Sequence, residues 1–282
     1  MPIMTALAGI VPPVLIAAIL VMSAWRPWRR GVEPGPSRDW AAAGAVGLSL
    51  AVAFPLVTGS LAFPPRSAVG WLPMMGLVAW VTGAGRTAWI RPFAVRALVA
   101  VVVCELAAWL ILRPMLRHAW LGGEGWARVL GLGGVAAVVW VLLVPLERRG
   151  ARVPLVMWVA SVGSAVVLVM SETASLAQAS GVLAVGLGVL VVVAWWRPGL
   201  PIARGAAGPW AMLQGAILMG GYAYAGTPPG LAAVVLLMVA PLGAWVAEVG
   251  ALSRRPAWMG TVAAMAAAGA ACGACGAALA LR

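Results

Sequence analysis

The sequence predicts an all-α, polytopic integral membrane helix bundle, and three observations lead to this fold class. Hydrophobic residues make up 63% of the 282 residues, charged residues only 9%, and the mean hydropathy is +1.02. A typical soluble domain carries about 25% charged residues. Apolar runs of about 20 residues, enough to cross ~30 Å of hydrocarbon as a helix, follow one another along the chain. We therefore expect a single transmembrane domain over 1–282 and no soluble domain.

About ten spans follow when the chain is divided at its clusters of arginine, proline and glycine. They are expected at 3–25, 40–62, 67–85, 93–112, 126–146, 153–171, 175–196, 209–225, 230–252 and 257–281. The first span lacks a preceding basic segment and a small-residue cleavage pattern, so we interpret it as a retained span rather than a signal peptide.

The expected span ends coincide with residues that favour the membrane surface. Proline cannot continue a regular helix, and arginine extends its charge toward water. Five arginines directly precede a proline, and each lies at or near a span end: Arg26, Arg91, Arg113, Arg197 and Arg255. Most of the 16 tryptophans also lie near span ends, as an interfacial aromatic belt requires.

The distribution of arginine predicts the orientation in the membrane. All 19 basic residues other than the one histidine are arginines, and fourteen of them fall in or beside the odd-numbered connectors. Because positive charge concentrates on the cytoplasmic side, we expect both termini to face outward from a cytoplasmic (inner) membrane. The net charge of +12 is therefore matched to anionic lipid headgroups, and no nucleic-acid partner is expected.

The two halves of the chain, 1–146 and 147–282, show weak self-similarity. Pro12 and Pro154 are 142 residues apart, and Glu105 and Glu248 are 143 residues apart. A duplication of five spans would give a 5+5 inverted repeat of the kind found in many transporters. The alternative is that spans rich in alanine, valine and leucine align with one another by composition alone.

Glu105 and Glu248 are candidate coupling or substrate residues, because ionisable groups within spans are costly and mark functional sites by default. Glu105 lies within the span 93–112 with no arginine three or four residues away. It must be protonated, solvated in a cavity or paired with another helix. Glu248 lies near a span end and precedes Arg254 and Arg255, which favours an interfacial ion pair. In an inverted repeat, Glu105 would lie in the outer half of the membrane and Glu248 in the inner half.

The short segment between the sixth and seventh spans raises a choice between a turn and a polar mouth. The turn is expected near 171–174, with Ser171 or Thr173 as the helix N-cap and Glu172 at the positive end of the helix dipole. Ser175 and Gln178 lie one turn apart. With Ser171, they either line a mouth leading inward or simply flank the turn.

Two further groups of polar residues are candidate sites. Gln214, Tyr222 and Tyr224 lie in the eighth span, and adjacent glycines allow that helix to break or to pack closely. Arg113, Arg117 and Arg128 lie in the one outward connector rich in arginine, and they are candidates for binding an anionic headgroup or solute.

Composition excludes several mechanisms. The sequence has one histidine, one aspartate and no lysine, so multi-histidine metal sites, haem ligation and Schiff-base cofactors are not expected. We predict no cofactor and no metal site. Cys272 and Cys275 form a CxxC within a run of small residues, which favours close helix packing over thiol redox chemistry.

Two classes of function remain, and a thiol-redox membrane enzyme is a weaker third. The first is a secondary permease or exporter of a small or lipidic solute. The second is a non-catalytic membrane subunit or scaffold that binds other membrane subunits. A permease predicts a water-accessible cavity around Glu105, whereas a scaffold predicts a tightly packed bundle with a free apolar face. No catalytic residue is expected in either case.

Overall fold

The computed structural model describes residues 2–26, 38–59, 63–65, 67–88, 92–120, 122–148, 150–197, 202–249 and 256–281. These residues form ten α-helices, and none of them lies in a β-strand. The helices are α1 (Pro2–Trp25), α2 (Asp39–Thr58), α3 (Leu72–Ala88), α4 (Phe93–His118), α5 (Gly122–Leu143), α6 (Arg152–Met170), α7 (Ala174–Trp196), α8 (Ala207–Tyr224), α9 (Leu231–Val239) and α10 (Ala257–Ala280). Short 3₁₀ segments precede α3 (η2, Val69–Trp71) and extend α5 (η3, Val144–Arg148) and α9 (η4, Ala240–Glu248).

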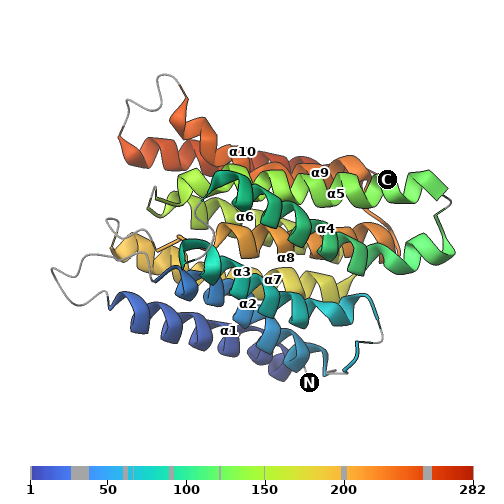
Figure 1. The fold of residues 1–282 in the computed structure, drawn as a ribbon, viewed down its shortest axis with the longest axis horizontal. Coiled ribbons are helices and arrows are strands. Elements are labelled where there is room, and N and C mark those ends of the chain that lie inside the picture. The colour runs from blue at the N-terminus through green and yellow to red at the C-terminus, as the bar shows by residue number, and fades with distance from the viewer. Residues whose placement is uncertain are drawn as a thin grey trace.

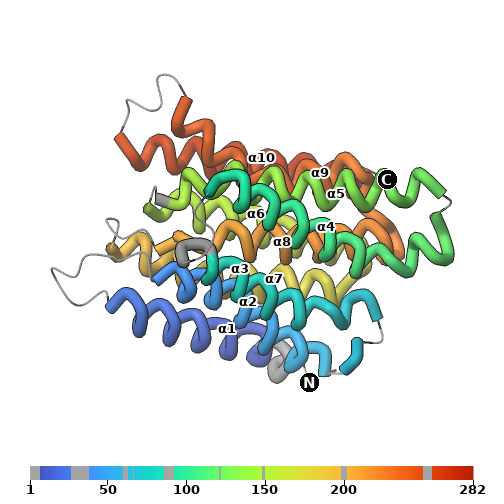
Figure 2. The backbone as a smooth tube through the Cα atoms, in the orientation of Figure 1, coloured from blue at the N-terminus to red at the C-terminus, as the bar shows by residue number. Residues whose placement is uncertain are grey.

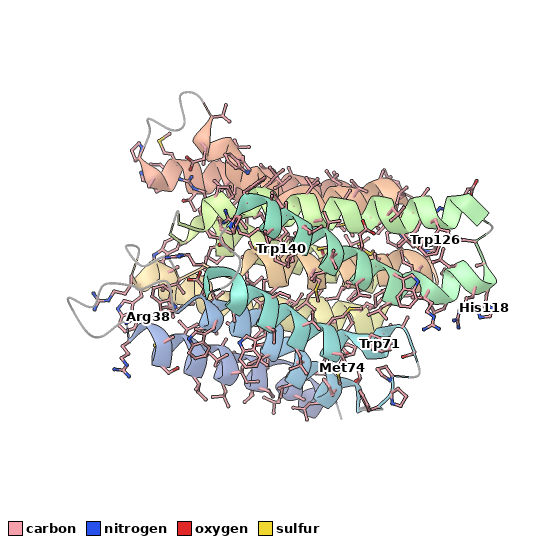
Figure 3. The ribbon with its side chains drawn as sticks, viewed as in Figure 1. Arg38, Trp71, Met74, His118, Trp126 and Trp140 are labelled. Atoms are coloured by element: carbon pink, nitrogen blue, oxygen red, sulfur yellow. The ribbon has the colours of Figure 1, made fainter. Side chains whose placement is uncertain are left out.

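Successive helices run up and down along one common direction. They alternate in sense, and both termini lie toward the same end of the bundle (Figure 1). The tube in Figure 2 follows the same path. Arg38 lies at one end, and His118 and Trp126 lie at the opposite end (Figure 3). The odd-numbered connectors, which hold most of the arginines, join helices at the Arg38 side. We call this side the arginine-rich end and the opposite side the far end.

Eight helical segments are long and apolar enough to cross a membrane. They are Leu7–Trp25, Asp39–Thr58, Phe93–His118, Gly122–Glu147, Arg152–Met170, Ala174–Trp196, Leu231–Glu248 and Ala257–Ala280. This apolar helix content supports a multi-pass membrane protein. Two of the ten predicted spans are not among the eight: α3 is a shorter apolar helix of 17 residues, and α8 carries Gln214 and two tyrosines.

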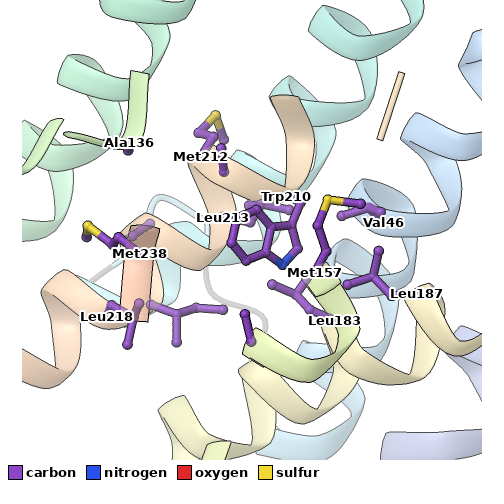
Figure 4. Close-up of a cluster of buried hydrophobic side chains, with 14 of the residues drawn as sticks. Val46, Ala136, Met157, Leu183, Leu187, Trp210, Met212, Leu213, Leu218 and Met238 are labelled. Atoms are coloured by element: carbon purple, nitrogen blue, oxygen red, sulfur yellow. The ribbon is translucent and has the colours of Figure 1, made fainter. Parts of the chain in front are cut away.

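The helix α8, which is not among the eight apolar segments, lies at the centre of the bundle. Every residue from Ala207 to Gly221 is buried, and the helix packs against α3, α4, α5 and α7. The close-up in Figure 4 shows Trp210 of α8 beside Met157 and Leu183 of the neighbouring helices. A helix enclosed by protein does not need an apolar surface for lipid, so the position of α8 explains its weak hydropathy.

Glycines allow α2 and α3 to cross in direct backbone contact. A Cβ built on Gly47 would lie 2.4 Å from the carbonyl oxygen of Gly76, and a Cβ on Gly76 would lie 2.5 Å from the carbonyl oxygen of Gly47. Inside a membrane, lipid tails solvate apolar side chains as well as protein does, so helices associate through close packing of small residues. This crossing fixes α2 against α3.

The helix α4 is longer than the sequence predicts. Its expected end was Leu112, before the Arg113-Pro114 pair, but the helix continues to His118 with Pro114 inside it. Proline removes one backbone hydrogen bond, whereas ending the helix inside the membrane would leave several backbone groups without partners. Glu105 lies at the middle of this 26-residue helix.

Candidate functional site

Glu105 lies at the centre of α4, with its carboxyl in a notch on α5. A Cβ built on Gly133 would lie 2.6 Å from Oε2 and 3.0 Å from Oε1 of Glu105, so the notch exists because residue 133 has no side chain. Oε2 is buried and has no hydrogen-bond partner among the described residues. Glu105 lies between the buried Cys104 and the exposed Leu106. The carboxyl is therefore at the border between the core and the membrane-facing side of α4.

A second polar group surrounds Gln214 in the core, and we call it the α8 polar cluster. It consists of Ser161 of α6, Ser180 of α7, and Trp210 and Gln214 of α8, all of them buried. The indole N–H of Trp210 donates to the Ser161 hydroxyl oxygen at 2.9 Å, and the Ser161 hydroxyl is 3.3 Å from Oε1 of Gln214.

Ser180 completes the α8 polar cluster. Its hydroxyl donates to the backbone carbonyl of Ser161 at 2.8 Å, and its oxygen accepts from Nε2 of Gln214 at 3.2 Å. A buried polar group without a partner costs about 1–3 kcal/mol. The cluster thus gives the Gln214 amide partners on two neighbouring helices and ties α6, α7 and α8 together. One turn after Ser161, the buried Ser164 has a hydroxyl with no partner among the described residues.

Glu105 and the α8 polar cluster lie at a similar level of the bundle and are linked by α5. A Cβ built on Gly215, the residue after Gln214, would lie 3.1 Å from Cβ of Ala136. Ala136 lies one turn along α5 from Gly133, which holds the Glu105 carboxyl. The two polar groups therefore lie near the middle of the bundle on helices that both pack against α5.

These groups define what the middle of the bundle can do chemically. A carboxyl can bind and release a proton, whereas serine hydroxyls and a glutamine amide can bind uncharged polar groups but transfer no charge. Comparisons of the chain with protein-family models, curated proteins and solved structures find no match. The functional argument therefore depends on the geometry of these residues.

The tyrosines of α8 lie at its far end, away from the α8 polar cluster. The Tyr224 hydroxyl donates to the backbone carbonyl of Ile111 on α4 at 2.6 Å. The ring of Tyr222 packs against Trp120, with 6.0 Å between ring centroids. Both tyrosines thus fasten α8 to the far end of α4 and its connector, and neither reaches Gln214 through a described hydrogen bond.

The turn between α6 and α7 forms where the sequence places it, but its capping differs. α6 ends at Met170 and α7 begins at Ala174. Thr173 occupies the cap position, yet its hydroxyl donates to the carbonyl of Leu168 at 2.9 Å instead of capping α7. Glu172 is exposed, and its left-handed backbone (φ 61°) directs the carboxylate toward Gly226, where a Cβ would lie 2.7 Å from Oε2.

The three polar side chains at this turn, Ser171, Ser175 and Gln178, do not point in one direction. Ser171 is buried, and its hydroxyl bonds back to the carbonyl of Val167 at 2.8 Å, whereas Ser175 and Gln178 are exposed. The first residue therefore faces the bundle and the other two face away from it. Helical spacing brought Ser175 and Gln178 onto one face, but only packing decided that this face points outward.

The three arginines selected as anion-binding candidates, Arg113, Arg117 and Arg128, do not converge on one site. The Arg113 guanidinium lies 5.2 Å from the ring centre of Trp109, and that of Arg128 lies 5.0 Å from the ring centre of Trp120. Arg128 also forms an ion pair with Glu124 at 3.4 Å, while Arg117 is exposed. Arg128 and Glu124 border an apolar groove of about 460 Å³ between α5 and α9.

Glu248 forms an ion pair at the arginine-rich end, but its partner is far away in the sequence. Its Oε1 accepts a hydrogen bond from Nη1 of Arg152 at the start of α6. Arg254 and Arg255, the partners expected from the sequence, lie outside the described residues. Glu248 joins η4 to α6 and is not near Glu105 in the middle of α4.

Two buried acids that the sequence reasoning did not select also lie at the arginine-rich end. Asp39, the first residue of α2, is fully buried, and its Oδ1 lies 3.5 Å from Nε of Arg204. Glu147 is fully buried in η3, and its Oε1 accepts a hydrogen bond from the backbone N–H of Ala207 at 3.0 Å. A carboxylate is favourable at a helix N-terminus because it meets unpaired N–H groups and the positive end of the helix dipole. Both acids fix the entry of α8 into the bundle.

The cysteines are packing residues in this fold. Cys104, Cys272 and Cys275 are all buried, and none of them is in a disulfide. A Cβ on Gly163 of α6 would lie 2.5 Å from Sγ of Cys272, so this thiol fills the space above a glycine. Among the described residues there is no group of three or more histidine, cysteine, aspartate or glutamate side chains that could hold a metal ion.

Proposed function

We propose that the protein is a secondary permease or exporter of a small or lipidic solute, formed by ten spans in a single transmembrane domain over 1–282. In this proposal, α3 and α8 cross the membrane with the eight more apolar segments, because the surrounding helices cover them. The arginine-rich end faces the cytoplasm, and both termini face outward from the inner membrane. The alternating course of the helices supports this orientation (Figure 1).

The observation that carries the proposal is the Glu105 carboxyl in its notch on α5. A charged side chain at the bilayer centre costs about 2.5–3.5 kcal/mol or more. Oε2 receives no hydrogen bond from the described residues that would offset this cost. The group is therefore held as a neutral carboxyl that ionises only when water or a cation reaches it. That property is what proton coupling requires.

The α8 polar cluster is the proposed solute-facing group. Gln214, Ser161 and Ser180 offer uncharged donors and acceptors on three helices, and α8 packs against α5, as the Glu105 helix α4 does. Separation of α8 from α6 and α7 would free these groups to bind a polar part of the solute. Because each bond lost would be replaced by a bond to solute, the change would cost little net free energy.

The proposal includes an inverted repeat of the halves 1–146 and 147–282. Some helix contacts agree with such a repeat and one does not. The pairs α1 with α2 and α6 with α7 both pack side by side, as do α4 with α5 and η4 with α10. However, α6 packs closely on α10, and the corresponding pair, α1 and α5, has no comparable contact among the described residues. Two symmetric halves would therefore have to differ in how their first and last helices meet.

The alternative function is a non-catalytic subunit or scaffold of a larger membrane complex. One observation favours it: residues Ala207–Gly221 of α8 are buried, and no residue of α8 lines the cavities found beside α4, α5 and α10. In that case the membrane-facing side of Glu105 would accept a hydrogen bond from a partner helix, and the α8 polar cluster would only hold α6, α7 and α8 together.

The deciding experiment measures water access to position 105. We would place a single cysteine at position 105 in a protein whose three native cysteines are replaced by alanine, and label it with a membrane-impermeant maleimide from each side. Leu106→Cys is the matched control, because Leu106 is adjacent but 49% exposed on the membrane-facing side. A permease predicts labelling at 105 from at least one side and none at 106.

Protection of position 105 from both sides, in a protein that elutes as a folded species, would overturn the permease proposal and support the scaffold. Labelling at 106 as strong as at 105 would also overturn it, because the middle of α4 would then lie in water rather than in lipid. Labelling at 105 that varies with pH on one side only would link the cavity directly to proton access.

A further inference from the structure

A groove at the arginine-rich end combines an apolar floor with a cationic rim. It has a volume of about 630 Å³ and is formed by the start of α6, the end of α7 and the start of α10. Ala194, Val262 and Met265 supply apolar lining. Trp195 and Trp258 stand at its rim, with 69% and 66% of their surfaces exposed. Exposed tryptophans at a helix end are typical of the headgroup level of a membrane.

The polar group at the rim is Arg152. Its Nη1 donates to Glu248, its Nη2 lies next to Gly260 of α10, and its buried Nε has no hydrogen-bond partner among the described residues. Glu248 therefore holds the guanidinium in place without using all of its donors. Arg152 lines the groove, and a planar guanidinium is well suited to bind a phosphate oxygen.

The sequence next to the groove-lining residues Gly150 and Ala257 is rich in arginine. Arg148 and Arg149 directly precede Gly150 at the edge of the groove, and Arg254 and Arg255 closely precede its residue Ala257. In the structure, Glu248 is paired with Arg152. The sequence beside the groove-lining residues thus carries further cations, and each cation favours an anionic lipid by about fivefold near a membrane surface.

We propose that this groove is a binding site for an anionic diacyl phospholipid from the leaflet at the arginine-rich end. The phosphate binds at Arg152 between the two rim tryptophans, and one acyl chain lies along α10 over Val262 and Met265. From Trp258 to Met265 the helix rises about 10 Å, which accommodates the upper half of an acyl chain. The site is separate from Glu105 and the α8 polar cluster and does not depend on the proposed transport function.

The test compares bound lipids on the purified full-length protein by native mass spectrometry. The protein in neutral detergent receives equal amounts of phosphatidylglycerol and phosphatidylcholine with the same acyl chains. Wild type should retain phosphatidylglycerol in preference by about fivefold or more. The double variant Arg152→Gln/Glu248→Gln removes the cation without leaving Glu248 unpaired, and it should reduce this preference several-fold.

Two variants test the location. Val262→Trp fills the groove and should abolish the preference, whereas Ala270→Trp adds the same side chain at an exposed position further along α10 and should leave it unchanged. Met265→Trp replaces Val262→Trp if the latter fails to elute as a folded species. Equal retention of the two lipids by wild type, or a full preference in the filled variant, would overturn the assignment.

Discussion

Gly133→Ala tests the Glu105 notch most directly, because it adds a single methyl group to α5 at the point where the Glu105 carboxyl lies. The new Cβ would lie 2.6 Å from Oε2 and 2.7 Å from Cδ of Glu105, whereas ordinary contacts begin at 3.4 Å. The carboxyl must therefore retreat by roughly 1 Å or leave the notch. Because it is the end of a flexible side chain, we expect it to leave toward the membrane-facing side of α4.

The size of the effect follows from the population of the two positions. If the notch holds the carboxyl with a preference of about 1 kcal/mol, roughly one molecule in six exposes it in the wild type. Gly133→Ala would expose it in nearly all molecules, which is a rise of about sixfold. The stability of the bundle should change little, because alanine gains about 1 kcal/mol of helix propensity over glycine and offsets part of any remaining strain.

The assay is the rate at which dicyclohexylcarbodiimide, a lipid-soluble reagent for protonated carboxyls, modifies Glu105, as followed by peptide mass spectrometry. Glu105→Gln provides the blank. Two glycines of the same helix are matched controls: a Cβ on Gly134 would lie 3.8 Å from Oε1 of Glu105, and a Cβ on Gly131 would meet nothing within 4 Å. Gly134→Ala and Gly131→Ala should leave the modification rate near that of the wild type.

An unchanged rate in Gly133→Ala, in a protein that remains folded, would refute the notch. Equal acceleration in all three alanine variants would also refute it, because the effect would then come from a general loosening of α5 rather than from the contact with Glu105.

Three further predictions concern packing and hydrogen bonds, each measured as thermal unfolding in detergent. Gly47→Ala should destabilise the bundle by about 1–3 kcal/mol because its Cβ would lie 2.4 Å from a backbone carbonyl. The control Gly269→Ala, whose Cβ would have no atom within 4 Å, should be neutral or slightly stabilising. Equal effects of the two substitutions would contradict direct contact between α2 and α3. Gln214→Leu should cost about 1–2 kcal/mol because it leaves buried serine groups with fewer partners, and a stabilised variant would show that the α8 polar cluster is not needed for packing. Tyr224→Phe should cost about 1 kcal/mol through loss of the 2.6 Å bond to the α4 carbonyl, and no change in unfolding would mean that this bond does not fasten α8 to α4.

The helical segments could be predicted closely from the sequence because their boundaries depend on local composition. The turn between Met170 and Ala174 was expected at the right place, since two apolar runs leave room for no longer connection. The predicted end of α4 was wrong. A proline removes one helical hydrogen bond, but backbone groups left without hydrogen bonds inside a membrane cost more free energy. That decision depends on the solvent around the helix and not on the Arg-Pro pair itself.

The candidate site was predicted only in part. Gln214 was selected because glutamine is rare in a span, but Ser161, Ser180 and Trp210 were not, since serine and tryptophan are ordinary residues in membrane helices. Nothing local indicates that residues 19 to 53 positions apart share one hydrogen-bonded cluster. Likewise, Glu147 resembles any acid at a helix end until the N-terminus of α8 is placed beside it.

The sequence by itself determined the class of protein, the approximate helices and the end at which positive charge accumulates, because hydropathy, arginine and proline act on the residues next to them. Only the tertiary structure decided that α8 is the central helix, that Glu105 fits against Gly133, and that Glu248 pairs with Arg152. These contacts depend on which helices become neighbours. In a membrane, the choice of neighbouring helices depends on small differences in shape between apolar surfaces, and the composition of a single span does not reveal these differences.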